Sequence, residues 1–228
     1  MASVAGVYIA RPASTGPQHR VVVGHQLFGI DASVRAFADR LAAEGCLVAV
    51  PDLYHRSAPG VELPQDDEGR ARGFELLHGL DRDEVVADVA AAVDVLGGDP
   101  AGVSMVGLSV GGHAAYLAAA RLGLAATAVL YPGWLTGTQI PMSRPEPTVT
   151  LTPAITGRLL FLVGGADHVV PPGDVATVAA ALRDSGVRHE VVVYPDTPHA
   201  FLLPGPPTYR PEPAADAWRR VLELITAS

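Results

Sequence analysis

The sequence predicts an α/β fold, in which helices cover both faces of a doubly wound, mainly parallel β-sheet. Short β-branched runs alternate with Ala-rich helical stretches along all 228 residues, and several of the runs are almost wholly apolar. Parallel strands that are covered on both faces have this apolar composition. Because the chain shows neither an internal repeat nor an interdomain linker, we expect residues 1–228 to form a single domain.

The predicted strands are short and rich in β-branched residues, and turn residues follow most of them. In chain order they are Val4–Ile9, Arg20–Val23, Leu47–Val50, Val103–Val106, Ala125–Leu130, Leu159–Val163 and His189–Tyr194.

Helix-forming stretches lie between these strands. Asp31 is placed to cap the first of them, and Gly45 and Gly97 lie just beyond the ends of two. In the second, apolar residues recur at helical spacing from Val85 to Leu96 and predict one buried face. The predicted helices are Ala32–Ala43, Asp83–Leu96, Gly112–Leu122, Asp174–Asp184 and Ala214–Ile225.

Two segments interrupt the alternation. His55–Leu80 is polar, with a short predicted helix near Glu68–Leu77, and Gly133–Gly157 is rich in proline. Each follows the carboxyl end of a predicted strand, where ligands bind in open α/β sheets. Two interpretations stay open for each: a surface connection, or a functional segment that serves as a lid or as a wall of the pocket.

The charge and composition exclude several classes of protein. The chain has 16 basic and 24 acidic side chains, a formal charge of −8, which argues against a surface for nucleic acid. All basic residues are Arg, and the absence of Lys excludes Schiff-base chemistry and the lysine of a P-loop. With 49% hydrophobic and 18% charged residues, the chain is not intrinsically disordered.

Cysteine content and the N-terminus indicate the compartment. Cys46 is the single cysteine, so we expect no intramolecular disulfide and no cysteine metal cluster, and we interpret Cys46 as a small core residue. Met1–Arg11 lacks the features of a signal peptide, and no apolar run approaches the roughly 18 residues of a membrane span. We expect a cytoplasmic monomer or small homo-oligomer without a membrane partner.

The clearest functional motif is Gly107-Leu108-Ser109-Val110-Gly111, a G-x-S-x-G sequence between a predicted strand and a predicted helix. On such a tight turn the serine hydroxyl is exposed at the edge of the sheet, and side chains larger than glycine two positions away would collide with the backbone. The first amides of the helix can then stabilise an oxyanion. We therefore interpret Ser109 as a nucleophile.

A serine hydroxyl needs a positioned base. Asp167 follows the predicted strand Leu159–Val163, and His199 follows the next strand. Ser109, Asp167 and His199 occur in the chain order of an α/β-hydrolase triad. His199 is the predicted base, and Asp167 is predicted to orient it.

Competing candidates have weaker support. Asp196 is close to His199 in sequence but is predicted to cap a turn, and His168 is predicted to point away or to line the pocket. His113 is expected to be packed or partly exposed in the helix after the motif. No metal is predicted, because no His or acidic residues have the spacing of metal ligands. Surface or lid positions are expected for His19, His55, His78 and His189.

Further segments recur in the order of one known family. Residues 24–29 (GHQLFG) are similar to its H-E-x-F-G segment, residues 39–45 to A-D-R-L-A-x-x-G, and residues 50–54 to A-P-D-L-Y. With the serine motif, Gly165-x-Asp167 and His199-Ala200-Phe201, the chain resembles the dienelactone hydrolase family of α/β-hydrolases over nearly its whole length. The resemblance implies an oxyanion hole formed by the backbone amides of Leu27 and Val110.

Two departures concern the nucleophile. The best-known members of the family carry Cys at this position, and a Glu in the H-E-x-F-G segment interacts with it; this chain has Ser109 and Gln26. A neutral amide suits a hydroxyl, so an ordinary serine mechanism is expected, with Gln26 in the substrate pocket.

A third departure concerns the substrate. Members that cleave dienelactone hold its carboxylate with two arginines; Arg70 matches one, but apolar residues follow His199 where the other is expected. Phe74 replaces an aromatic hydroxyl. We therefore expect a more apolar pocket, although core packing is an equal alternative for each wall. The candidate walls are Phe74, Leu77, Trp134, Leu135, Phe201 and Leu202.

Together these observations predict a cofactor-independent serine hydrolase that cleaves a small-molecule ester or lactone through an acyl-enzyme. An acyltransferase or cyclase that uses the same triad, for example in polyketide or other secondary metabolism, is the alternative if water is excluded. A non-catalytic binding module is a third alternative, which the complete set of triad residues disfavours.

Overall fold

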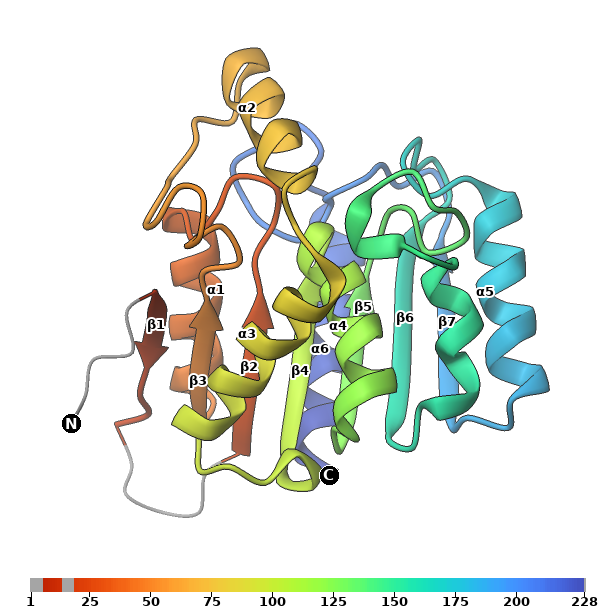
Figure 1. Cartoon of the computed structure of the whole chain (residues 1–228), viewed down its shortest axis with the longest axis horizontal. Helices are drawn as coiled ribbons and strands as arrows, with labels where there is room; N and C mark the ends of the chain where they lie inside the picture. Colours follow the sequence, from red (N-terminus) through yellow and green to blue (C-terminus); the bar gives the residue numbers. More distant parts are fainter. Residues whose placement is uncertain (1–5, 14–18, 228) are drawn as a thin grey trace.

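We describe a computed structural model, which covers residues 6–13 and 19–227. A seven-stranded sheet runs through it in the order β1-β3-β2-β4-β5-β6-β7 (Figure 1). β1 pairs with β3 in antiparallel orientation, and the other neighbours pair in parallel. The strands are β1 (Val7–Ala10), β2 (His19–Gly24), β3 (Cys46–Pro51), β4 (Val103–Leu108), β5 (Ala126–Leu130), β6 (Arg158–Gly164) and β7 (His189–Tyr194).

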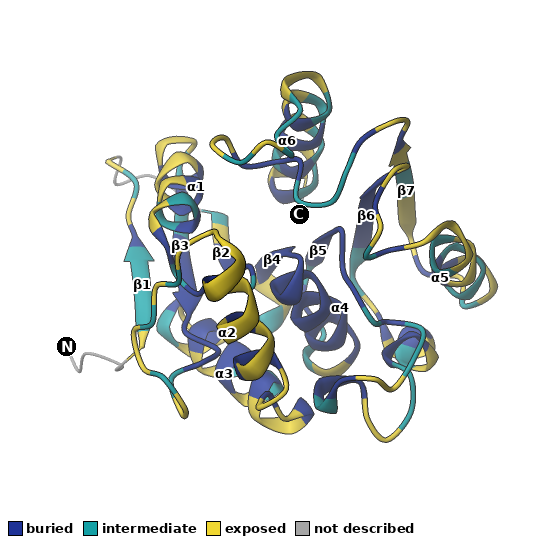
Figure 2. Cartoon of the chain, turned by 90° about the horizontal axis from the view of Figure 1, so that it is seen from above, coloured by how far each residue is buried: buried dark blue, intermediate teal, exposed yellow. Residues whose placement is uncertain are grey.

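Helices cover both faces of the sheet, as the sequence predicts. The helices are α1 (Ala32–Ala43), α2 (Asp67–Leu77), α3 (Arg82–Val95), α4 (Val110–Leu122), α5 (Pro172–Asp184) and α6 (Pro211–Thr226). α1 and α6 lie on one face, and α3, α4 and α5 lie on the other (Figure 2). Alternate strand residues pack on opposite layers: Val22 belongs to the α3–α4 side, whereas Val21 and Val23 belong to the α1–α6 side.

The predicted element boundaries differ from the observed ones by a few residues. α1 and β7 have the predicted bounds, and the carboxylate of Asp31 caps α1 by accepting a hydrogen bond from the Val34 amide at 2.9 Å. α4 begins at Val110, two residues earlier than predicted. The predicted start of the first strand, Val4, lies outside the described residues.

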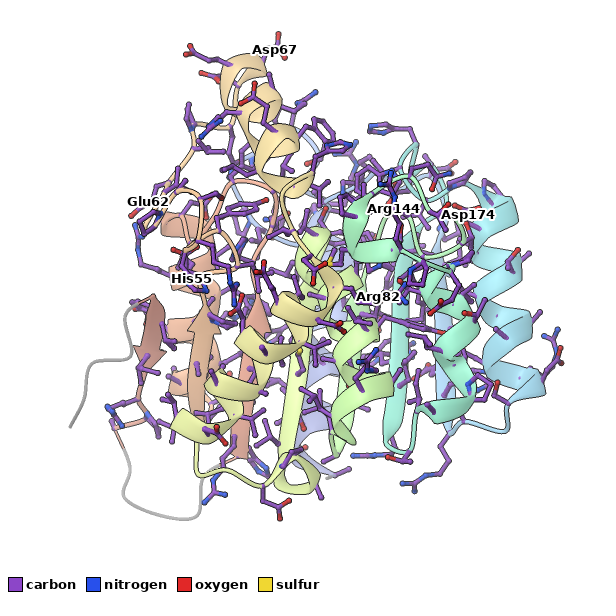
Figure 3. The ribbon with its side chains drawn as sticks, in the orientation of Figure 1. His55, Glu62, Asp67, Arg82, Arg144 and Asp174 are labelled. Atoms are coloured by element: carbon purple, nitrogen blue, oxygen red, sulfur yellow. The ribbon has the colours of Figure 1, made fainter. Side chains whose placement is uncertain are left out.

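The segment 133–157 is packed against the body of the protein. Two short 3₁₀ helices within it, η2 (Pro141–Ser143) and η3 (Thr148–Ala154), contact α3, α4 and α5. Arg82 of α3, which is 5% exposed, donates to the Met142 carbonyl at 3.1 Å and to the Glu146 carboxylate at 2.6 Å (Figure 3). This buried guanidinium anchors the segment, and Trp134 is its one residue that lines the cavity described below.

The other irregular segment carries α2, which stands above the carboxyl edge of the sheet (Figure 1). Asp66 caps this helix through the Gly69 amide, 2.8 Å away. A Cβ added at Gly69 would lie 1.9 Å from the carbonyl oxygen of Pro64, and a Cβ added at Gly73 would lie 2.6 Å from Cγ of Leu27. These two glycines therefore let α2 pack closely on the loop after β2.

A helix that spans a bilayer must be both long and apolar, and no helix within residues 6–13 and 19–227 meets both conditions.

Candidate active site

Ser109 lies on the sharp turn between β4 and α4. Its backbone has φ 56° and ψ −110°, a conformation that costs a non-glycine residue free energy and that clusters at functional sites. The Ser109 amide donates to the Leu130 carbonyl at 3.0 Å, and the residue is 8% exposed. The turn thus holds the hydroxyl at the carboxyl edge of the sheet, as predicted for the G-x-S-x-G motif.

Three glycines make this turn sterically feasible. A Cβ at Gly107 would lie 2.0 Å from the Gly111 carbonyl oxygen, and a Cβ at Gly111 would lie 2.2 Å from the carbonyl carbon and oxygen of Gly24. Both contacts are with backbone atoms, which cannot rotate away. The Gly111 amide also donates to the His25 carbonyl at 2.9 Å, so the turn packs directly on the loop after β2.

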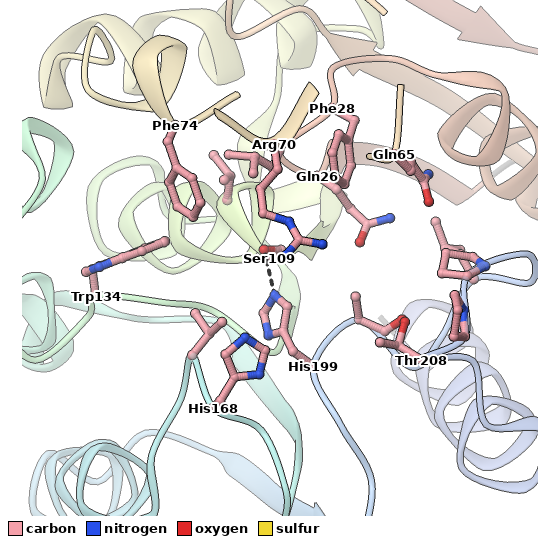
Figure 4. A pocket seen from close by; sticks show the side chains of 17 residues that line it. Gln26, Phe28, Gln65, Arg70, Phe74, Ser109, Trp134, His168, His199 and Thr208 are labelled. Atoms are coloured by element: carbon pink, nitrogen blue, oxygen red, sulfur yellow. Dashed lines mark hydrogen bonds between the residues drawn. The ribbon is translucent and has the colours of Figure 1, made fainter. Parts of the chain in front are cut away.

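The structure brings Ser109, His199 and Asp167 together, and Figure 4 shows the contact between Ser109 and His199. Ser109 Oγ lies 3.0 Å from His199 Nε2, and His199 Nδ1 lies 2.8 Å from Asp167 Oδ2. The side chain of Asp167 is fully buried, and that of His199 is 15% exposed. The three residues come from separate loops, each at the carboxyl end of a parallel strand, and their distances allow a proton to pass from the hydroxyl to the imidazole.

Asp167 is fixed by the backbone as well as by His199. Its Oδ1 accepts hydrogen bonds from the Val169 amide at 2.8 Å and the Val170 amide at 3.1 Å. An ionised Asp167 can only accept, so Nδ1 of His199 carries the ring proton and Nε2 faces Ser109 as an acceptor. Asp196 is exposed, and His199 pairs with Asp167 instead.

A cavity of about 240 Å³ opens beside Ser109. The predicted site residues Gln26, Leu27, Arg70, Phe74, Val110 and Trp134 all line it. Among the described residues, neither the Leu27 amide nor the Val110 amide donates a hydrogen bond, so both remain free to bind an oxyanion.

The aromatic and basic lining defines the chemistry of the cavity. Phe74 and Trp134 meet edge to face with ring centroids 6.2 Å apart, and Phe74 is 37% exposed. Arg70 points towards Ser109 (Figure 4), and within the described part of the chain its guanidinium forms no ion pair. Since no Asp or Glu among the described residues lines the cavity, this positive charge is available to a ligand.

Several predicted walls are core residues instead. Phe201 is fully buried and packs against Tyr131 and Tyr194, with ring centroids 5.5 and 5.1 Å apart, so it does not line the cavity. The same correction applies to three leucines, which are at most 5% exposed and belong to the two core clusters: Leu77, Leu135 and Leu202. Hydrophobic character alone did not distinguish these positions from the pocket wall.

The loop after His199 also lines the cavity, although the sequence did not predict it as part of the site. Its members that line the cavity are Ala200, Leu203, Pro206, Pro207 and Thr208. Phe28, Gln65 and Val169 also line it without having been proposed. The loop is rich in proline and follows the carboxyl end of β7, which is the signal that singled out the other two segments, so the same criterion would have found it.

The competing histidines lie elsewhere or have other partners. His113 is fully buried, contacts the Gly133 carbonyl and Thr148, and burial lowers its pKa to about 4. His168 lines the cavity, with its ring centroid 6.3 Å from that of His199. His55 contacts Asp88, while His78 and His189 contact carbonyl oxygens of Phe74 and Val187. His19 begins β2.

Cys46 lies outside this site. Burial raises the pKa of the Cys46 thiol to about 11, so this side chain stays protonated in the core. Within the described ranges, no three His, Cys, Asp or Glu side chains gather in a group that could hold a metal ion.

Comparisons with known proteins identify the family to which the chain belongs. A model of the dienelactone hydrolase family matches residues 5–228. A protein of Synechocystis sp., provisionally named carboxymethylenebutenolidase, is 32% identical over 226 residues, which cover 96% of this chain and 89% of that protein. The carboxymethylenebutenolidase of Pseudomonas putida is 29% identical over 224 residues, covering 96% and 90%.

A crystal structure from Klebsiella pneumoniae, of a protein provisionally named dienelactone hydrolase, matches with a TM-score of 0.85 and 30% identity and covers 97% of this chain and 92% of that one. The predicted family resemblance and the predicted α/β-hydrolase fold are therefore confirmed. The chain belongs to the dienelactone hydrolase family and is a hydrolase.

Proposed function

We propose that the protein is a serine hydrolase that cleaves carboxylic esters or lactones through an acyl-enzyme on Ser109. The observation that carries this proposal is the continuous contact from Ser109 Oγ to His199 Nε2 at 3.0 Å and from His199 Nδ1 to Asp167 at 2.8 Å, beside a cavity. The names of the relatives support a lactone or ester as the substrate.

In the first step, Ser109 Oγ attacks the carbonyl carbon of the substrate while His199 Nε2 takes the hydroxyl proton. The carbonyl oxygen becomes an oxyanion, to which the Leu27 and Val110 amides donate hydrogen bonds. When this intermediate collapses, the bond to the alkoxy oxygen breaks and His199 returns the proton to that oxygen. An ester then releases its alcohol, whereas a lactone keeps the new hydroxyl on the acyl chain.

In the second step, His199 takes a proton from water, whose oxygen attacks the acyl carbon. The Leu27 and Val110 amides donate hydrogen bonds to the second oxyanion. When this second intermediate collapses, the bond between the acyl carbon and Ser109 Oγ breaks. His199 returns the proton to the serine, and the free acid leaves. Asp167 stabilises the imidazolium in both steps without taking its proton.

A fluorophosphonate probe tests the nucleophile. We expect the probe to label the wild type on the peptide that contains Ser109, because His199 activates that hydroxyl, and Ser109→Ala to remain unlabelled and inactive. Ser104→Ala is the matched control, since Ser104 is 4% exposed and lies on β4, the strand that leads to Ser109; this variant should be labelled normally. Labelling that persists in Ser109→Ala, as mapped by mass spectrometry, would exclude Ser109 as the nucleophile.

Turnover in ¹⁸O-labelled water separates hydrolysis from the two alternatives. If water is the acceptor, one ¹⁸O enters the released acid at each turnover. An acyltransferase or cyclase gives an unlabelled ester or ring, and a binding module gives neither turnover nor probe labelling. Either of the last two results would contradict the proposed hydrolysis.

Arg70 is expected to favour substrates that carry a carboxylate. Its guanidinium is unpaired within the described residues and faces the cavity. Arg70→Ala should therefore raise KM about tenfold for a half-ester of a dicarboxylic acid, because a tenfold change is the effect expected from the loss of one charged hydrogen bond. KM for the neutral diester should stay within about twofold. Arg72→Ala is the control, because Arg72 pairs with Glu75 on the exposed side of α2. An equal rise for both esters would show that Arg70 does not bind the carboxylate.

A further inference from the structure

His25 is a buried histidine that the proposed mechanism does not use. It lies in the loop after β2, its side chain has 0% exposure, and its ring packs against Tyr54 with centroids 4.9 Å apart. Both ring nitrogens have partners: Nε2 lies 3.1 Å from the Leu53 amide nitrogen, and Nδ1 lies 2.6 Å from the Gln26 carbonyl oxygen.

These partners determine where the ring proton lies. A backbone N–H can only donate, so Nε2 accepts from Leu53 and carries no proton. Nδ1 then holds the proton and donates it in a hydrogen bond to the Gln26 carbonyl. Burial lowers the pKa of His25, which keeps the ring in this neutral form.

The Gln26 carbonyl belongs to the same peptide unit as the Leu27 amide. A trans peptide unit is planar, and its C=O and N–H point in opposite directions. Because His25 binds the Gln26 carbonyl oxygen, the Leu27 N–H on the opposite side of this peptide unit points away from the His25 ring. Leu27 lines the cavity beside Ser109, and within the described residues its N–H has no acceptor.

The neighbouring carbonyls are also held. The Gly111 amide donates to the His25 carbonyl at 2.9 Å, and the Tyr54 hydroxyl donates to the Leu27 carbonyl at 3.1 Å. The Gly29 amide makes a longer contact of 3.4 Å with the Gln26 carbonyl. Three successive carbonyls therefore have donors, and the shortest of these contacts acts on the peptide unit that bears the Leu27 N–H.

We propose that His25 is a positioning residue of the oxyanion hole, whose Nδ1–H fixes the peptide plane that aims the Leu27 amide at the developing oxyanion. This inference rests on the proposed acyl-enzyme mechanism. Donation to a carbonyl also polarises the N–H of the same peptide unit and strengthens the bond that it gives. His25 itself neither takes nor gives a proton during the reaction.

Two amide variants separate the functions of the two ring nitrogens. The side-chain amide of Asn can place its NH₂ near the position of Nδ1, so His25→Asn keeps the donor to Gln26 and loses the acceptor for Leu53. The longer Gln can place its oxygen near Nε2, so His25→Gln keeps the acceptor and loses the donor. Each variant loses one buried hydrogen bond, and we expect similar falls in the melting temperature.

The kinetic effects of the two variants should differ. Removing an oxyanion donor costs about 10²- to 10³-fold in kcat, so misdirecting one in His25→Gln should cost about 10- to 100-fold, with KM within about twofold. His25→Asn should keep kcat within about threefold of the wild type. A boronic acid inhibitor, whose oxygen binds in the oxyanion hole, should lose affinity in parallel with kcat.

Tyr54→Phe controls for general loosening of the loop, because it removes the bond to the Leu27 carbonyl in the next peptide unit. Its kcat should fall less than that of His25→Gln. Equal kcat in the two His25 variants, a change in KM alone, or an equal loss in Tyr54→Phe would overturn the inference. Turnover that persists in Ser109→Ala would instead show that the proposed function is wrong.

Discussion

Replacement of His199 by alanine is expected to lower kcat by about 10⁴-fold or more, because no other side chain of the described residues contacts the Ser109 hydroxyl. Asp167→Asn should lower kcat by a similar factor, of about 10⁴, since the amide can donate to Nδ1 and so favours the wrong tautomer of the imidazole. Pre-steady-state kinetics with an activated ester measure both effects directly on the acylation step.

His168→Ala provides the matched control, because this histidine also lines the cavity but has no contact with Ser109 within the described residues. Its kcat should stay within about tenfold of the wild type, well short of the loss expected for a triad member. Combining His199→Ala with Ser109→Ala should cost little more than either change alone, because residues that act as a unit are not additive. Near-normal turnover by the His199→Ala variant would exclude His199 as the base.

Gly111→Ala is expected to destabilise the fold by about 3 kcal/mol or more and to abolish turnover. The new methyl group would lie 2.2 Å from two backbone atoms of Gly24, so either the start of α4 or the loop after β2 must shift. A shift of α4 would displace Ser109, which directly precedes it, and a shift of the loop would displace Leu27. Chemical denaturation measures the loss in the free energy of unfolding, and probe labelling measures the displacement of Ser109.

Gly173→Ala is the control for this change. Gly173 is the second residue of α5, as Gly111 is of α4, but apart from its chain neighbours and the backbone of its own helix, no atom of the described residues lies within 4 Å of an added Cβ there. Alanine should therefore leave the stability unchanged or raise it by up to about 1 kcal/mol, through the higher helix propensity of alanine. If the two variants were equally stable, close packing would not be the reason for glycine at position 111.

Local signals in the sequence predicted the elements whose ends depend on local chemistry. Asp31 before an apolar stripe gave the correct bounds of α1, and the β-branched run of β7 needed no tertiary information. Gly111 and Gly112 are poor helix formers, so local propensity favours a later start of α4. The packing of the turn against Gly24 overrides that preference, and α4 begins earlier than predicted. The anchoring of segment 133–157 depends on Arg82, which bonds to residues 60 or more positions away. No local pattern records such a contact.

The same distinction applies to the site. Chain order and strand ends were sufficient to select Ser109, Asp167 and His199, because parallel strands bring their carboxyl ends to one edge. The pocket walls were harder to predict. In the loop after His199, Phe201 faces the core whereas Leu203 lines the cavity, and an irregular loop has no periodicity from which to infer that difference.

The close seating of α2 on its two glycines has a consequence for how substrate preference can change. One short helix presents both the cation, Arg70, and the aromatic ring, Phe74, to the reaction centre, yet contributes none of the three residues that contact one another there. We therefore expect that replacing α2 with the corresponding helix of another family member changes the selectivity for charge and shape together and leaves the contacts among Ser109, His199 and Asp167 in place.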